Sequence, residues 1–174
     1  MNQPRNTRET DMTIKHIAIR TPVFSNIGRR KYNVIEEHNR VVNEQGFCFL
    51  AKFGQNPDKR KIESIIRQIG KGIETKVILF SAVNGEIKAH AALIDAVAHD
   101  FDPSDEQEHY PPYYDLMELD YGLWMRIRAP FEAFELDRVR LVSNGKLLRD
   151  VAQSCRTPLM IVSGDTPKTS SDSL

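Results

Sequence analysis

The chain has 174 residues, of which 40% are hydrophobic and 28% are charged, with 24 basic and 24 acidic side chains. This size accommodates one domain with an ordinary buried core and excludes two well-packed domains. No run approaches the roughly 18 consecutive apolar residues of a membrane helix, and the polar first residues lack the apolar segment of a secretory signal, so we expect a soluble, cytoplasmic protein.

The first half of the chain predicts two strands and two helices. Alternation over residues 16–20 indicates a short strand, and a proline-bearing loop with Ser25 and Asn26 near a helix start is expected to follow it. Apolar residues then recur at helical spacing over 34–42, and Gly46 ends that helix. The apolar run 47–52 predicts a buried strand, and isoleucines at helical spacing over 62–69 predict a second helix.

The second half begins with a hairpin. Residues 76–82 and 87–97 are strand-like runs on either side of Asn84-Gly85, a pair that favours a tight primed turn, so we prefer a strand to a helix for the alanine-rich second run. The further elements expected are a strand over 121–128, a short strand over 139–141, a helix from Leu147 to Cys155 and a strand over 158–162.

These elements do not alternate regularly, which predicts an α+β fold: a small curved sheet or β-barrel flanked by about three helices. We expect a single domain over residues 14–163. The polar segments 1–13 and 164–174 are expected to be disordered.

The charges are unevenly distributed along the chain. Residues 1–78 carry 15 basic and 8 acidic side chains, whereas residues 91–124 carry no Lys or Arg and nine Asp or Glu. The clusters Arg29-Arg30-Lys31 and Lys59-Arg60-Lys61 each precede a helical pattern, so we expect them to project towards phosphates. The acidic segment predicts a surface that polyanions avoid.

The order of motifs along residues 46–163 resembles that of a known superfamily. It comprises the strand GFCFLAKFG at 46–54, the hairpin KVILFSAVNGEIKAHAALIDAV at 76–97, an insert with paired tyrosines, a strand bearing Trp124, and SNGKLL at 143–148. It resembles the PUA-like superfamily and, within it, the EVE and YTH-type domains. The resemblance implies a small β-barrel with helices that binds nucleic acid, in several members by taking a modified base into an aromatic pocket. Residues 15–45 are then an N-terminal strand-helix extension.

The resemblance also implies which residues form the site. We expect a module that stacks a modified or flipped base and needs no cofactor; whether the nucleic acid is RNA or DNA stays open. The base-binding residues it implies are Phe53, Tyr113, Tyr114 and Trp124, with Ser81, Ser143 and Asn144 as hydrogen-bonding groups. The phosphate-binding residues expected are Lys52, Arg126, Arg29, Arg30, Lys31, Lys59 and Arg60.

Other classes of function were weighed against this one. His99, Asp100, Asp102, Asp105 and His109 are the densest group of metal-ligating side chains, but their spacing matches no ligand signature, and we expect no metal. One alternative is a small metal-independent ribonuclease that uses Lys52, Tyr113 and Arg126. The other is a protein-interaction module that binds a partner through residues 95–120.

Overall fold

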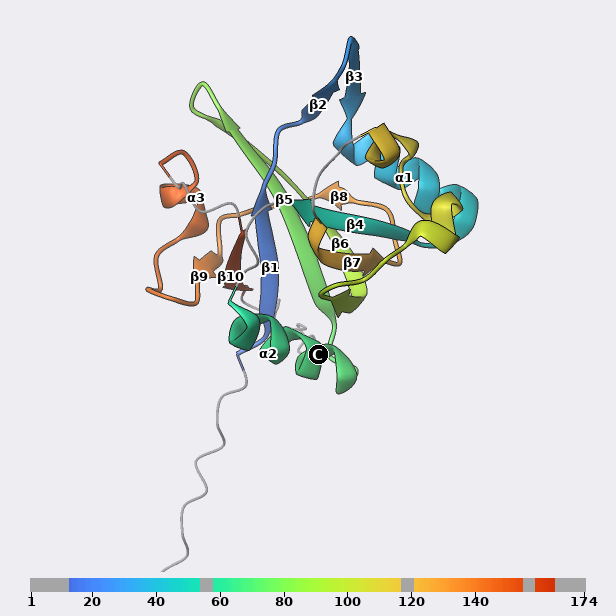
Figure 1. Cartoon of the computed structure of the whole chain (residues 1–174). Helices are drawn as coiled ribbons and strands as arrows, with labels where there is room; N and C mark the ends of the chain where they lie inside the picture. Colours follow the sequence, from blue (N-terminus) through green and yellow to red (C-terminus); the bar gives the residue numbers. More distant parts are fainter. Residues whose placement is uncertain (1–12, 54–57, 117–120, 155–158, 165–174) are drawn as a thin grey trace, which may run out of the picture.

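The computed structural model describes residues 13–53, 58–116, 121–154 and 159–164, and it shows an α+β fold around a mixed eight-stranded sheet (Figure 1). The strands are β1 (Lys15–Arg20), β2 (Phe24–Ile27), β3 (Arg30–Asn33), β4 (Cys48–Phe53), β5 (Thr75–Val83), β6 (Glu86–Ala98), β7 (Tyr121–Ile127), β8 (Glu132–Ala133), β9 (Val139–Leu141) and β10 (Leu159–Gly164). The helices are α1 (Val34–Gln45), α2 (Lys59–Gly70) and α3 (Leu148–Val151), with 3-10 turns η1 (Ser104–His109) and η2 (Pro112–Leu116). Among the described residues, no helix is long and apolar enough to cross a membrane.

The main sheet has the order β4-β7-β6-β5-β1-β10-β9, with β8 paired to β6. Only β1 and β5 are parallel, and the other pairs are antiparallel. Three strands separate β4 from β1 in this order, yet residues of β4 and β1 line one common pocket. The sheet therefore curves until its β4 edge approaches β1, but no strand pair among the described residues closes it.

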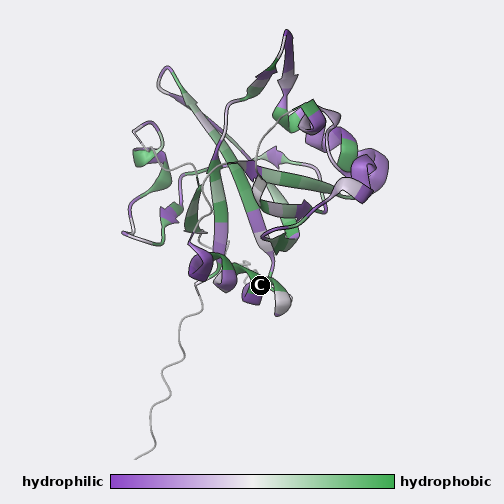
Figure 2. Cartoon of the chain, in the orientation of Figure 1, coloured by the Kyte–Doolittle hydropathy of each residue, from purple (hydrophilic) through white to green (hydrophobic). Residues whose placement is uncertain are grey.

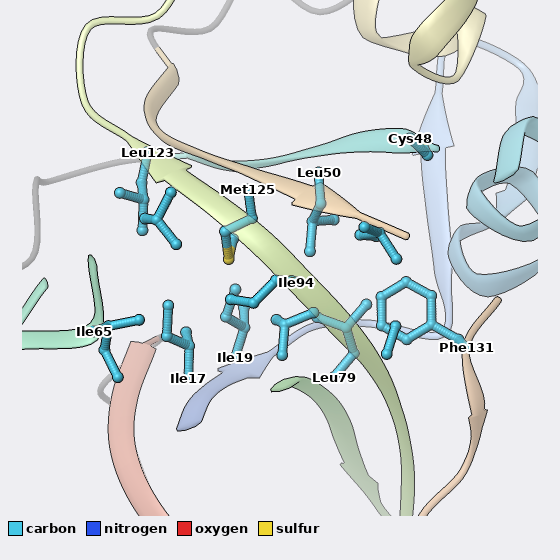
Figure 3. Close-up of a cluster of buried hydrophobic side chains, with 14 of the residues drawn as sticks. Ile17, Ile19, Cys48, Leu50, Ile65, Leu79, Ile94, Leu123, Met125 and Phe131 are labelled. Carbon is cyan, nitrogen blue, oxygen red and sulfur yellow. The ribbon is translucent and has the colours of Figure 1, made fainter. Parts of the chain in front are cut away.

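The concave side of the curved sheet holds the largest core cluster (Figure 3). Leu50 of β4, Met125 of β7 and Leu79 of β5 point into it, together with Ile65 from α2. The thiol of Cys48 lies in the same cluster, where burial raises its pKa, as expected for a structural cysteine. Alternate residues along β4 and β7 thus face inward, and their neighbours face outward.

The outward face of β4 and β7 is covered by the long insert between β6 and β7. Phe49 and Trp124 lie on this face and pack with Tyr110, Tyr113 and Tyr114 of the insert in a separate aromatic cluster. Helix α1 flanks the same region. Its N-terminus is capped by the Asn33 side chain, which accepts a hydrogen bond from the Glu36 amide at 3.0 Å.

Most predicted elements agree with this fold, but three segments differ. These are residues 24–33, the unpredicted strand β8, and the helix expected from Leu147 to Cys155, of which only Leu148–Val151 is helical and Cys155 lies outside the described residues. The hairpin of β5 and β6 turns at Asn84 and Gly85, whose φ angles of 52° and 80° both fit the expected primed turn. The loop and helix start predicted around Ser25 and Asn26 are wrong for residues 24–33. These residues form the separate hairpin β2–β3, and Arg29-Arg30-Lys31 lies at its turn and on β3.

A short turn explains how this hairpin forms. Ile27 pairs with Arg30, so Gly28 and Arg29 are the two central residues of the turn. Gly28 has a φ of +62°, a conformation that glycine adopts without strain, and glycine at the first central position is the signature of a type II′ hairpin turn. The strands have only four residues each, which is why the alternation was too short to be recognised.

Candidate nucleic-acid interface

A pocket of about 260 Å³ lies where the β4 edge of the sheet approaches β1. We call it the β1–β4 pocket. It brings together one end of β1, the end of β4 and the tyrosines of η2. Its lining residues are Ile19, Arg20, Thr21, Pro22, Ser25, Val34, Leu50, Ala51, Lys52, Leu79, Tyr113 and Tyr114.

The charged groups that line the pocket are both cationic. Arg20 and Lys52 line it, and no Asp or Glu is among its described lining residues. Lys52 continues the inward-facing series of Cys48 and Leu50 on β4, so its stem is partly withdrawn from water. This burial lowers the pKa of the Lys52 ammonium. A partly desolvated cation binds an anionic or electron-rich group more strongly than a fully solvated one.

Tyr114 is fixed by a buried hydrogen-bond network. His38 Nδ1–H donates to the Val34 carbonyl at 2.6 Å, which leaves His38 Nε2 to accept from the Tyr114 hydroxyl at 2.5 Å. The Ala51 amide also donates to that hydroxyl, at 3.4 Å. His38 is fully buried, and this desolvation lowers its pKa to about 4, so the ring is neutral at pH 7. The network joins α1, β4 and η2 around one wall of the pocket.

The predicted stacking residue Trp124 lies behind this wall, away from the pocket. Its side chain is 3% exposed and is not among the residues that line the pocket. Four aromatic rings surround it, with centroid distances of 6.0 Å to Tyr114, 6.2 Å to Phe101, 6.3 Å to Phe49 and 6.3 Å to Tyr110. Trp124 and Lys52 occupy opposite faces of the β4–β7 ribbon. The structure therefore places Trp124 as a support for Tyr114.

The β2–β3 hairpin stands beside the pocket. Ser25 of β2 lines the pocket, and Tyr32 of β3 packs against Tyr113 with ring centroids 5.1 Å apart. The hairpin projects from the rest of the fold, and its end is hydrophilic (Figure 2). Arg29, Arg30 and Lys31 are all exposed there. Three of the predicted phosphate-binding residues thus lie on the element that borders the pocket.

A larger hollow of about 690 Å³ lies near α2 and β10, at the opposite end of the molecule from the hairpin (Figure 1). We call it the α2–β10 groove. It brings together the predicted residues Arg60, Ser143 and Asn144, with Leu159, Met160 and Ile161 on its apolar side. Its other charged lining residues are Lys15, Asp58, Lys61 and Lys146. The Asn144 side chain accepts from the Lys146 amide at 3.0 Å, which supports the local turn.

The remaining predicted residues join neither of these hollows. Arg126 lies on the outward face, where its Nε donates to Asp95 at 2.7 Å and its guanidinium lies over the Phe47 ring. Ser81 is buried on β5, and Lys59 is exposed at the start of α2. The side chain of Phe53 is outside the described part of the structure. The predicted ribonuclease set is not assembled, because Arg126 and Lys52 lie on opposite faces of the sheet.

The acidic insert exposes most of its carboxylates away from the pocket lining. Asp102 and Asp105 are exposed near and within η1, and Asp115 accepts from the Tyr110 hydroxyl at 2.8 Å. His109 stacks on Phe47 with ring centroids 3.9 Å apart. Among the described residues, no group of three or more His, Cys, Asp or Glu could hold a metal ion.

Of the polar residues that line the β1–β4 pocket, Arg20, Thr21 and Ser25 are absent from the predicted site. Arg20 ends the first predicted strand, and Ser25 lies in the segment where the sequence predicts a loop. Charge was the available signal: no Asp or Glu occurs between Asp11 and Glu36, whereas five Lys or Arg do.

Comparisons with protein-family models, with curated proteins and with solved structures find no match to this chain. The functional argument therefore depends on the geometry of the chain itself.

Proposed function

We propose that this chain is a nucleic-acid-binding module of the PUA-like kind, near the EVE and YTH-type domains, with a curved sheet that approximates their barrel. In this proposal the β1–β4 pocket takes a flipped or unpaired base, which can be a modified one. The observation that carries the proposal is that Arg20, Lys52 and two tyrosines line one pocket, whose described lining residues include no carboxylate.

The size and composition of the pocket fit a base better than a larger ligand. Its volume of about 260 Å³ is just below the roughly 300–1,000 Å³ of sites for drug-sized molecules. Tyr113 and Tyr114 are only 4% and 3% exposed, so a base would stack on the part of their rings that lines the pocket. Stacking a base on an aromatic side chain contributes about 1–3 kcal/mol. Extruding a base costs a few kcal/mol, and the pocket must offset that cost.

The cations at and beside the pocket are suited to bind the phosphate groups next to an extruded base. Arg20 and Lys52 line the pocket, and Arg29, Arg30 and Lys31 stand on the adjacent hairpin. Lys and Arg that approach phosphates release counterions, so binding must weaken steeply as salt is added. The acidic insert supplies Tyr113 and Tyr114 to the pocket, and none of its described carboxylates lines the pocket.

The test is fluorescence anisotropy with single- and double-stranded DNA and RNA, unmodified and carrying methylated or hydroxymethylated bases, at low and moderate salt. We expect salt-sensitive binding that Lys52→Met weakens by about tenfold or more, the cost of a lost charge-assisted contact. Lys71→Met is the matched control, because Lys71 is exposed after α2 and does not line the pocket. Absence of binding to every oligonucleotide at low salt would refute the proposal and favour a protein-interaction module.

A further inference from the structure

The β2–β3 hairpin presents two unlike faces. Its cross-strand pairs are Phe24 with Asn33, Ser25 with Tyr32, Asn26 with Lys31, and Ile27 with Arg30. Ile27 and Tyr32 pack against the aromatic cluster, so they anchor the hairpin to the fold. Phe24, Asn26 and Lys31 are exposed on the other face. The packed face holds the hairpin in place on the fold, and the exposed face is accessible to a ligand.

The outer face has the side chains that contact nucleic acid. Phe24 is 42% exposed, and the Lys31 ammonium lies over its ring at 4.5 Å from the centroid. Asn26 stands opposite Lys31 on the neighbouring strand, and its amide can pair with the donor and acceptor on the edge of adenine. Arg29 adds an exposed cation at the turn, and no residue of the hairpin is acidic. Arg30 is also exposed next to the turn, but it pairs with Ile27 and so lies on the packed face. The exposed cations suit a polyanion, and the amide and the aromatic ring suit the edges and faces of bases, so nucleic acid fits this surface.

The dimensions of the hairpin select one form of nucleic acid. Four strand residues extend about 13 Å, and two paired strands lie about 5 Å apart. The major groove of B-form DNA is about 12 Å wide and 8.5 Å deep, which admits a two-stranded ribbon of this kind. The major groove of A-form RNA is deep and too narrow for side chains to read.

We propose that the β2–β3 hairpin enters the major groove of double-stranded DNA, so that the β1–β4 pocket receives a nucleotide extruded from a duplex beside the hairpin. The inference rests on the proposed function, because it assigns a substrate class to the same pocket. Ser25 supports the coupling, since it belongs to the hairpin and lines the pocket. Arg29 contacts phosphates or guanine edges, and Asn26 and Phe24 contact bases near the extruded one.

The test compares three ligands of one sequence: a DNA duplex, its single strand and the corresponding RNA duplex. The hairpin variant is Arg29→Ala with Arg30→Ala and Lys31→Ala, all exposed positions. The matched control removes three exposed cations outside the hairpin and the β1–β4 pocket, through Arg67→Ala, Lys71→Ala and Lys146→Ala. Circular dichroism and thermal melting establish that both triple variants fold as the wild type does.

We expect the hairpin variant to lose about tenfold or more in affinity for the DNA duplex, with a slope of log affinity against log salt that is smaller by about two to three. The control should change that affinity by less than about threefold, because its cations lie at the far end of the molecule. Unchanged duplex binding by the hairpin variant, or an equal loss for all three ligands, would overturn the inference. In that case binding of single strands that depends on Lys52 would leave the proposed function standing, whereas absence of all binding would refute both.

Discussion

Replacing Trp124 by alanine should destabilise the protein rather than remove a binding surface. The indole is 3% exposed and packs against four aromatic rings. Truncation of a buried tryptophan costs about 3–5 kcal/mol through lost burial and the cavity that remains. For a chain of this length each kcal/mol lowers the melting temperature by about 2–4 °C, so we expect a decrease of roughly 6–20 °C.

The assay is urea unfolding of wild type, Trp124→Ala and Trp124→Phe, followed by far-ultraviolet circular dichroism because the only tryptophan is removed. Trp124→Phe keeps a ring against Tyr114 and should lose less than half as much free energy of unfolding as the alanine variant. An unfolding free energy of Trp124→Ala within about 1 kcal/mol of wild type, combined with lost nucleic-acid binding, would refute the buried placement. The indole would then be a wall of the base pocket, as the sequence predicted.

Three further predictions concern the pocket and its support. Lys52→Met should weaken binding but change the free energy of unfolding by less than about 1 kcal/mol, because methionine keeps the partly buried apolar stem; a urea melt that shows a larger destabilisation would contradict this. Tyr114→Phe should cost about 1–3 kcal/mol in a urea melt, because His38 Nε2 loses its buried donor; a neutral effect would show that the network does not support the wall. His38 is neutral in the folded protein, because its pKa is lowered from 6.5 to about 4. Its contribution to the free energy of unfolding is therefore complete above pH 6.5, and up to about 3 kcal/mol of it is lost as the pH falls towards 4. His38→Gln should flatten that part of the stability profile; an unchanged pH dependence would assign the loss to other groups such as His16, whose pKa burial also lowers to about 4.

Most of the fold could be predicted because its elements carry strong local signals. The isoleucines of α2 recur at helical spacing, and Asn84-Gly85 specifies the turn between β5 and β6. The strand preference for the alanine-rich β6 is confirmed, because the hairpin turn outweighs alanine's helix propensity. Whether the sheet closes depends on how near β4 comes to β1. These strands are separated in the sheet, and no local sequence pattern predicts that distance.

The candidate site was predictable only in part. Lys52, Tyr113 and Tyr114 do meet in one pocket, because β4 and η2 bring them there. Ser143 and Asn144 lie elsewhere with Arg60, since sequence order does not show how far a sheet curves. The alternation of β7 shows that Trp124 lies on the opposite face from Leu123 and Met125. It does not show whether that face is exposed to solvent or covered by the insert.

The most direct test of the central claim is to locate the base on the protein. A photoreactive 5-iodouracil, placed at an unpaired position of a DNA oligonucleotide, is cross-linked to the protein by irradiation, and the modified residue is identified by fragmentation of the peptide in a mass spectrometer. Cross-links at Tyr113 or Tyr114 that disappear in Lys52→Met are the predicted result. Cross-links confined to residues of the α2–β10 groove, or their absence from a complex that forms in solution, would contradict the assignment of the β1–β4 pocket as the site of the base.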